Sequence, residues 1–226
     1  NHRTHDMGPR SRGPSHDRLS SPQRLASLDP GALTRAMAKL YFHYSTMNAG
    51  KSTLLLQASH NYRERGMATL LLTAALDTRA GPGRIGSRIG IGADATPFWP
   101  DTDLFALIEA EGRGVACVFV DEAQFLTPAQ VWQLARVADD LRIPVMAYGL
   151  RVDFKGQLFP GSAELLALAD DLREVRTICH CGRKATMVVR RGPDGQVLHD
   201  GAQIQIGGNE TYDSLFRRHW REAMGM

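Results

Sequence analysis

The sequence predicts an α/β fold in which a parallel sheet is flanked by helices, and three observations support this prediction. From Lys39 onward, short apolar segments alternate with segments of helical period, as they do in βαβ units. Val115–Val120 is apolar without interruption, which is typical of a strand buried on both faces of a parallel sheet. Ser45–Ser52 ends in Gly-Lys-Ser between an expected strand and an expected helix. The predicted class is therefore P-loop NTPase-like, or RecA-like.

The elements of this sheet follow one another along the chain as alternating strands and helices. Strands are expected at Leu40–Tyr44, Ala68–Ala74, Val115–Val120, Ile143–Tyr148 and Leu172–Ile178. Helices are expected at Lys51–Arg65, at Asp103–Glu111, from Thr127 to about Leu141, and at Gly161–Ala169. The third helix has the clearest start, because Thr127 suits an N-cap, Pro128 suits the first helical position and Gln130 completes a capping box. Residues 77–101 hold five Gly and three Pro and are expected to form a long functional loop.

A change of character after residue 178 predicts a small appended module over residues 179–226. Within it a strand is expected at Ala185–Arg190, a turn at Gly192–Gly195, a strand at Gln203–Ile206 and a helix over residues 211–223. Residues 1–36 are rich in Arg, Ser, Pro and His without a helical or strand period, so a disordered tail is expected there. The alternative for the tail is an Arg-rich arm that binds RNA or membranes, although Asp residues interrupt its charge. An α/β domain is expected at residues 37–178.

Composition argues against several partners. The chain has 27 basic and 24 acidic residues; six Arg and three Asp fall within residues 1–36, so 21 of each sign remain beyond them. A neutral folded part has no overall electrostatic surface for a polyanion, so no nucleic-acid partner is expected. No apolar run approaches the ~20 residues of a membrane span, and no membrane partner is expected. Three cysteines, two of them nearly adjacent, favour a reducing compartment and a metal site over a disulfide.

The P-loop segment has the residue types that phosphate binding needs. Backbone N–H groups of the loop and of the helix N-terminus are expected to face the phosphates. Lys51 would bring a positive charge to the β- and γ-phosphates of ATP, and Ser52 would offer a hydroxyl to Mg²⁺. Ser45 departs from the usual pattern, which has Gly at that position. The structural alternative is a Gly-Lys-Ser triplet that opens an ordinary helix.

Two acids at the end of the third expected strand supply the second half of such a site. Asp121 is expected to hold Mg²⁺ through water. Because side chains alternate along an extended segment, Glu122 is expected to point elsewhere and to face the acceptor hydroxyl. To this point the residues predict phosphoryl transfer or ATP hydrolysis without identifying the acceptor.

Several further motifs resemble one family, the type II thymidine kinases of bacteria and of animal cytosol, over residues 37–223. The motifs are Tyr44–Ser52, Asp77-Thr78-Arg79, Val120–Phe125, Tyr148–Arg151 with Asp153-Phe154, Cys179–Lys184, and Ile206–Tyr212. The resemblance implies a kinase domain at 37–178 and a lasso and zinc module at 179–226. It implies transfer of the γ-phosphoryl of ATP to the 5′-hydroxyl of thymidine, and also of deoxyuridine, giving dTMP in nucleotide salvage for DNA synthesis. It also implies a cytoplasmic homotetramer.

The resemblance implies a role for each matching residue. Glu122 would be the general base that accepts the proton of the 5′-hydroxyl. The residues assigned to ATP and Mg²⁺ are Ser45, Thr46, Met47, Asn48, Ala49, Gly50, Lys51, Ser52, Asp77, Arg79, Asp121 and Gln124. The residues assigned to the nucleoside are Leu56, Phe125, Leu150, Phe154, Ile204, Gln205, Ile206, Gly207, Gly208 and Tyr212. Core packing is the alternative for the two aromatic rings, Phe125 and Phe154.

A structural Zn²⁺ site is implied near the start of the module. Cys179, Cys181 and His219 are the assigned ligands, while Phe216 stands where the family pattern places another cysteine. A structural Zn²⁺ takes four ligands, so His180, His199 or water remains open for the fourth, as does the loss of the site. Cys117 lies within an expected buried strand and is interpreted as a small core residue.

Two other functions remain as alternatives. Asp121–Gln124 after an apolar strand resembles a helicase box, so a nucleic-acid-dependent ATPase is the first. The short chain and its neutral folded part argue against it. A non-catalytic nucleotide sensor with a zinc ribbon is the second, and the presence of both Lys51 and Glu122 argues against that, because a sensor needs no base.

Overall fold

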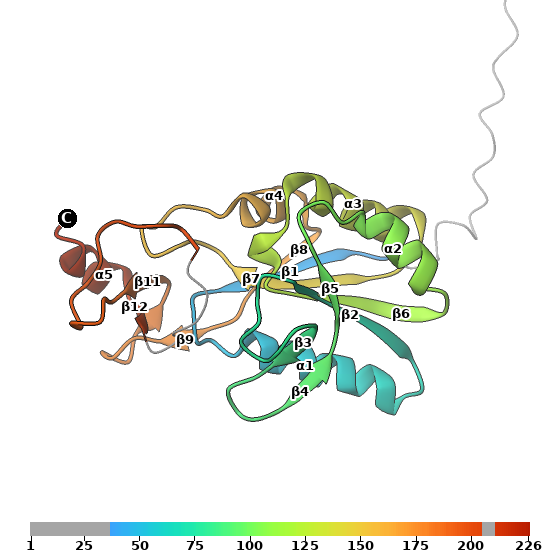
Figure 1. Ribbon diagram of the computed structural model, residues 1–226, viewed down its shortest axis with the longest axis horizontal. Coiled ribbons are helices and arrows are strands. Elements are labelled where there is room, and N and C mark those ends of the chain that lie inside the picture. The colour runs from blue at the N-terminus through green and yellow to red at the C-terminus, as the bar shows by residue number, and fades with distance from the viewer. Residues whose placement is uncertain (1–36, 205–210) are drawn as a thin grey trace, which may run out of the picture. The chain divides into compact units, whose positions relative to one another are not determined.

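A six-stranded parallel sheet with the strand order β5-β2-β6-β7-β1-β8 organises the computed structural model, which describes residues 37–204 and 211–226 (Figure 1). Its strands are β1 (Leu40–Ser45), β2 (Ala68–Ala74), β5 (Thr96–Phe98), β6 (Val115–Asp121), β7 (Val145–Leu150) and β8 (Asp171–Glu174). All five ladders of this sheet are parallel. The predicted parallel α/β sheet is confirmed. The strand before the P-loop, β1, and the strand that ends in Asp121, β6, flank β7 on its two sides.

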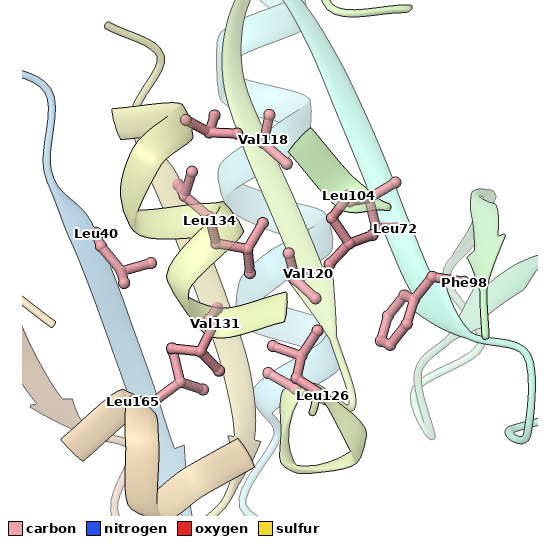
Figure 2. Close-up of a cluster of buried hydrophobic side chains, with 14 of the residues drawn as sticks. Leu40, Leu72, Phe98, Leu104, Val118, Val120, Leu126, Val131, Leu134 and Leu165 are labelled. Atoms are coloured by element: carbon pink, nitrogen blue, oxygen red, sulfur yellow. The ribbon is translucent and has the colours of Figure 1, made fainter. Parts of the chain in front are cut away.

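Helices cover both faces of the sheet. α1 (Lys51–Glu64) lies on one face, while α2 (Leu104–Glu111), α3 (Pro128–Asp140) and α4 (Pro160–Leu168) lie on the other (Figure 1). The period of two along β6 separates the two cores. Val118 and Val120 pack with Leu134 of α3, as Figure 2 shows, and Cys117 and Phe119 pack on the side of α1. Cys117 is fully buried, so its interpretation as a small core residue is confirmed.

The start of α3 is the one that the sequence predicts. Thr127 accepts a hydrogen bond from the backbone N–H of Gln130, and the Gln130 side chain accepts one from the backbone N–H of Thr127. The Gln130 amide also donates to the carbonyls of Trp99 and Thr102, at 2.7 and 3.0 Å. The capping box therefore also ties α3 to the segment that follows β5.

The segment expected to be one long loop contains short strands. β3 (Arg84–Gly86) and β4 (Gly92–Asp94) pair as an antiparallel hairpin, and β5 joins the edge of the main sheet. The five glycines and three prolines of the segment favoured the prediction of a loop. Each of these strands is only three residues long, and its stability comes from neighbouring strands rather than from its composition.

The module after β8 differs from the sequence prediction at its end. It contains β9 (Thr177–Ile178), β10 (Lys184–Ala185), β11 (Met187–Arg190), β12 (Tyr212–Leu215) and α5 (Arg217–Ala223). The helix predicted over residues 211–223 is wrong in its first half, because the backbone of β12 pairs antiparallel with β11. The helix begins only after Phe216. The expected strand at 203–206 is absent at Gln203 and Ile204, and its other two residues lie outside the described ranges.

Apolar side chains of this module form a cluster of their own. Met187, Val189, Leu215, Trp220 and Met224 are among its buried members, which also include Cys179 and Val152. The boundary predicted at residue 179 stays a prediction. In the part of the chain that the structure describes, no helix is both long and apolar enough to span a membrane. The expectation of a disordered tail concerns residues outside the described ranges.

Candidate active site

The loop between β1 and α1 has the backbone of a phosphate-binding turn. Asn48 (φ 61°) and Gly50 (φ 83°) both adopt the left-handed conformation, which Gly takes at no steric cost and Asn takes more readily than most residues. Lys51 is 8% exposed, and its Nζ donates a hydrogen bond to the Thr46 carbonyl at 2.8 Å. Ser45, which replaces the usual Gly, is buried and donates from its hydroxyl to the carbonyl of Val175. The unusual residue is thus tied to the neighbouring β8–β9 segment.

A cavity opens above this loop. It is lined by Met47, Asn48, Ala49, Gly50, Lys51, Ser52, Thr53, Asp77, Arg79, Ala80, Gly86, Ser87, Arg88, Ile89, Glu122 and Leu150. Six of the eight predicted P-loop residues face it, while Ser45 and Thr46 lie buried behind the loop. The β3–β4 hairpin contributes Ser87, Arg88 and Ile89 to the lining of this cavity, so part of the segment 77–101 borders the P-loop space. The sequence had marked that segment as functional without identifying these residues.

Asp121, the last residue of β6, is placed as a metal-binding carboxylate would be. Its side chain is 3% exposed, and its Oδ1 has no hydrogen-bond partner among the described residues. Burial, together with the charge of Glu122, raises the pKa of Asp121 to about 7, while a hydrogen bond with the Ser52 hydroxyl acts in the opposite direction. A buried carboxylate oxygen that lacks a partner beside the P-loop hydroxyl fits a site for Mg²⁺.

The backbone at Glu122 differs from the extended conformation that the sequence predicts. β6 ends at Asp121, and Glu122 itself adopts a left-handed conformation with φ 52° and ψ 38°. The expectation that strand alternation separates the two carboxylates is therefore wrong. A left-handed conformation at a residue with a side chain is uncommon, and such strain concentrates at functional sites.

Both carboxylate oxygens of Glu122 have partners. Arg79 donates from a terminal guanidinium nitrogen to Oε1, and Gln124 donates from Nε2 to Oε2. Arg79 also donates hydrogen bonds to both carboxylate oxygens of Asp77, at 2.7 Å each. The Gln124 carbonyl oxygen accepts a hydrogen bond from the backbone N–H of Leu150 at 2.9 Å. The carboxylate is thereby fixed between the segment after β2 and the end of β7.

Gln124 fits this position only because of its neighbour in β7. A Cβ at Gly149 would lie 2.9 Å from the backbone nitrogen of Gln124 and 3.0 Å from its side-chain oxygen. Gln124 is 2% exposed and does not line the cavity above the P-loop. It was predicted among the residues that bind ATP, but its observed partners are Glu122 and Leu150.

A second cavity lies beyond Glu122. Its empty space of about 600 Å³ includes the open solvent at its mouth. It is lined by Met47, Asp77, Arg79, Glu122, Gln124, Phe125, Leu150, Val152, Asp153, Phe154, Phe159, Val188, Gln203, Ile204 and Tyr212. Five of these residues, namely Met47, Asp77, Arg79, Glu122 and Leu150, also line the first cavity. Glu122 therefore stands at the junction of the two spaces.

Five of the six described residues assigned to the nucleoside meet in this second cavity. Phe125, Leu150, Phe154, Ile204 and Tyr212 all line it. Leu56 does not; it lies 5% exposed in the core between α1 and the sheet. The remaining four assigned residues, Gln205, Ile206, Gly207 and Gly208, lie outside the described ranges.

Hydrogen bonds that no sequence pattern indicates link the P-loop to β12. The hydroxyl of Ser214 donates to the Met47 carbonyl at 2.6 Å and lies 2.9 Å from the hydroxyl of Thr46. Asn48 donates to the Tyr212 carbonyl at 3.4 Å. Because residues 212–215 were expected to be helical, these contacts could not be foreseen. β12 thus contacts the P-loop and also lines the second cavity through Tyr212.

Cysteine and histidine side chains gather at the start of the module. The Cys179 sulfur lies 3.3 Å from Nδ1 of His219 and 3.6 Å from Nδ1 of His180. The two imidazole rings stack with centroids 4.7 Å apart. Cys181 also interacts with Cys179 through backbone and side-chain hydrogen bonds. The predicted ligands Cys179, Cys181 and His219 are therefore neighbours, and the structure adds His180 to them.

The electrostatics of Cys179 suit a metal ligand. Burial raises the pKa of its thiol, but hydrogen bonds from the backbone of Cys181 and Phe216 and from the side chains of His219 and Cys181 outweigh this and bring it to about 6. A thiolate with imidazole neighbours is a donor set that Zn²⁺ prefers. Among the described residues, the ligand atoms of Cys179, His180 and His219 lie within 4.8 Å of one another. The residues present fit a Zn²⁺ ion.

Comparisons with known proteins agree on one family. The family model described as thymidine kinase matches residues 38–220. A thymidine kinase of Ruegeria pomeroyi is 74% identical over 191 residues, covering 84% of this chain and 96% of the relative. Thymidine kinases of Rhizobium etli and of a Jannaschia species are 69% and 70% identical over 191 residues, covering 83% and 84% of this chain and 96% and 98% of the relatives. A solved Pif1 helicase from Candida albicans is 12% identical with a TM-score of 0.37, covering 65% of this chain and 38% of that one, a likeness too weak to bear on function.

Proposed function

This chain belongs to the thymidine kinase family and is a kinase, and from this premise we propose that the two joined cavities hold ATP and thymidine with Glu122 between them. The observation that supports the proposal most directly is that Glu122 lines both cavities. Phosphoryl transfer needs the acceptor hydroxyl, its base and the γ-phosphate in one place. The junction is the place where a hydroxyl from one cavity meets a phosphate from the other.

The cavity above the P-loop is the proposed site of ATP. Lys51 and the N-terminus of α1 line this cavity, and the Lys51 side chain and the backbone N–H groups of the loop and of α1 would face the phosphates there. Asp121 and Ser52 would hold Mg²⁺, which when bound neutralises charge on the β- and γ-phosphates. Arg88, on the β3–β4 hairpin, adds a positive charge to the opposite wall of this cavity. Burial lowers the pKa of Lys51, whereas the nearby charges of Glu122 and Asp121 act in the opposite direction.

The second cavity is the proposed site of thymidine. Phe125 and Phe154 offer aromatic walls for a planar base, and Leu150 borders it with apolar surface. The loop over residues 204–208 is proposed to pair the edge of the base. A small apolar wall favours the thymine methyl, which is worth only ~1–3 kcal/mol, so deoxyuridine is an expected second substrate.

Glu122 is the proposed general base. Its carboxylate would accept the proton of the 5′-hydroxyl as that oxygen bonds to the γ-phosphorus and ADP departs. Arg79 donates to Glu122 and Asp77 in the structure and also lines the ATP cavity. It is therefore proposed to face the charge that develops on the transferred phosphoryl group. Gln124 is proposed to hold the other carboxylate oxygen in place, a role in positioning rather than in binding ATP.

Two further properties are proposed on the basis of the family resemblance. One Zn²⁺ per chain would be held by Cys179, Cys181, His219 and, as the fourth ligand, His180, and would supply cohesion to a small module. The enzyme is proposed to act in the cytoplasm as a homotetramer, where thiols stay reduced. Size-exclusion chromatography with light scattering tests the tetramer.

A panel of nucleosides tests the central proposal. Release of ADP from ATP and Mg²⁺ is followed with thymidine, deoxyuridine, deoxycytidine and deoxyadenosine as acceptors. We expect thymidine-dependent release, a lower rate with deoxyuridine and none above background with the other two. Release that DNA stimulates and thymidine does not would instead support the nucleic-acid-dependent ATPase.

A further inference from the structure

We propose that Arg190, a buried residue of β11, is a positioning residue for thymidine that holds both the Phe154 wall and the first residues of the loop over the base. The proposal rests on the assignment of the second cavity to the nucleoside. Neither the sequence motifs nor the family resemblance assigned any role to Arg190. Its guanidinium does not line the cavity and acts through residues that do.

The first contact of Arg190 is with an aromatic wall. The guanidinium carbon lies 4.0 Å from the centroid of the Phe154 ring. Phe154 is 1% exposed, and its carbonyl accepts a hydrogen bond from the indole N–H of Trp220 at 3.1 Å. The ring is thus held on one face by a cation and at its backbone by an indole. Arg190 is itself 4% exposed, so its attraction to the ring is little weakened by water.

The second contact is with the root of the loop, residues 200–204. Arg190 donates from a terminal nitrogen to the Ala202 carbonyl at 2.8 Å. A Cβ at Gly201 would lie 2.3 Å from the other terminal nitrogen, so a side chain at this position would displace the guanidinium. Ile204, two residues beyond Ala202, lines the cavity. The root therefore enters the site directly from its contact with Arg190.

Two further polar contacts join the root of the loop to the neighbours of Phe154. Gln203 donates from its side chain to Asp153 at 3.0 Å, and Lys155 donates to the Gly201 carbonyl at 3.2 Å. Asp153 and Lys155 are the neighbours of Phe154 in sequence. The root of the loop and the Phe154 wall are thus joined three times. Arg190 and Lys155 each contact both the Phe154 ring and the loop backbone, and the Arg190 guanidinium lies closer to the ring centroid, at 4.0 Å against 5.8 Å for Nζ of Lys155.

Burying a guanidinium costs solvation free energy, which its interactions within the protein must offset. Nε of Arg190 lacks a hydrogen-bond partner among the described residues, so the site does not fully repay the loss of water. A methionine replaces the aliphatic stem and the unpaired Nε with apolar groups, but it is shorter than Arg and does not reach the position of the guanidinium. What it would lose is the hydrogen bond to Ala202 and the cation over Phe154. The expected consequence is a looser nucleoside site in a protein of similar stability.

The test compares Arg190→Met with Arg191→Met. Arg191 is the next residue in the chain, and its side chain is bound to Asp213 and to the Gly195 carbonyl instead. For Arg190→Met we expect KM for thymidine to rise about 10-fold or more, with KM for ATP and kcat changed less than about threefold. For Arg191→Met we expect all three constants within about twofold. Arg190→Lys keeps the charge but loses the planar group, so an intermediate KM for thymidine is expected.

A matched pair of glycine variants probes the same contact from the loop side. Gly201→Ala places a methyl group against Arg190, whereas Gly195→Ala adds one where no atom lies within 4 Å. Both glycines have positive φ, at 134° and 78°, so both variants carry backbone strain. Only Gly201→Ala is expected to raise KM for thymidine. It also keeps the proposal testable if Arg190→Met does not fold.

Phe125→Ala distinguishes a failure of the cavity assignment from a failure of the role proposed for Arg190. If it leaves KM for thymidine unchanged, the second cavity is not the nucleoside site and the inference fails with that assignment. If Phe125→Ala raises KM for thymidine while Arg190→Met and Gly201→Ala leave it within about twofold, the cavity assignment stands and the role of Arg190 is overturned. Equal rises in the KM values for ATP and thymidine in Arg190→Met would also overturn it, because they would indicate general loosening.

Discussion

Nε2 of Gln124 lies 2.5 Å from Oε2 of Glu122, two residues earlier in the chain, and the same Gln124 amide accepts a hydrogen bond from the backbone of Leu150. The carboxylate that both cavities share is thereby tied to the end of the neighbouring strand β7. Loss of the amide would leave one oxygen of Glu122 unpaired in a buried place.

Gln124→Leu is therefore expected to lower kcat by about 10-fold or more, with KM for thymidine changed less than about threefold. Steady-state kinetics with both substrates varied measures the split. Gln57→Leu is the matched control, because Gln57 is exposed on α1 and its side chain donates a hydrogen bond to Asn61. Equal losses in kcat and thymidine affinity would contradict a role in positioning the base.

Glu122→Gln keeps the shape of the side chain and removes the proton acceptor. Turnover is expected to fall by ~10²–10⁴, with little loss of thymidine binding. Single-turnover rates and the equilibrium dissociation constant for thymidine check the two halves of this expectation. Glu111→Gln, at an exposed acid at the end of α2, serves as the control. A variant at position 122 with nearly normal turnover would rule out the assignment of the base.

Asp121→Asn is expected to stabilise the protein without Mg²⁺ and ATP while abolishing most activity. The folded carboxyl keeps its proton up to about pH 7, whereas the unfolded one loses it near 3.8. The folded state therefore binds more protons between these values, and the free energy of unfolding of the native sequence falls as pH rises through that window. Asn carries no charge, so the free energy of unfolding of the variant does not fall for this reason.

Melting temperatures of the native sequence and of Asp121→Asn at several values between pH 5 and 8 test this prediction. The advantage of the variant should grow up to about pH 7 and then stay constant. Addition of Mg²⁺ and ATP should raise the melting temperature of the native protein more than that of the variant. An advantage that is independent of pH would contradict the raised pKa.

Metal analysis of protein purified without added chelator should find about one Zn²⁺ per chain. Cys181→Ser and His180→Ala should each lower the zinc content and raise KM for thymidine, because the module that carries β12 and Tyr212 loses cohesion. His199→Ala is the control, since His199 lies outside the described cluster. Stoichiometric free thiols, no metal and full activity would show that the module needs no zinc.

A protein that starts at Met37 is expected to fold and to phosphorylate thymidine like the full chain. The family model begins at residue 38, and residues 1–36 show no apolar period from which a core element could form. Circular dichroism and steady-state kinetics on both proteins check this. Loss of activity in a truncated protein that remains folded would show that the first 36 residues take part in function.

The sequence by itself determined the parallel sheet and the two segments that end its strands β1 and β6, namely the P-loop and the acids Asp121 and Glu122. Local patterns suffice for these features, because an apolar strand such as Val115–Val120 and a capping box such as the one at Thr127 have their causes within a few residues. The P-loop is likewise a local motif, and its left-handed Asn48 and Gly50 are residue types that favour that conformation.

Only the tertiary structure decided how the site is joined together. Residues 212–215 form a strand because β11, more than twenty residues earlier, offers them backbone partners, and no local pattern records such a partner. The contacts of Ser214 with the P-loop and of Arg190 with Phe154 depend on that pairing. The position of His180 beside Cys179 and His219 likewise depends on how its own module folds. Glu122 leaves its strand in a strained backbone conformation that the contacts of Arg79 and Gln124 hold in place. These contacts bring together residues far apart in the chain, so their energy appears only once the chain has folded.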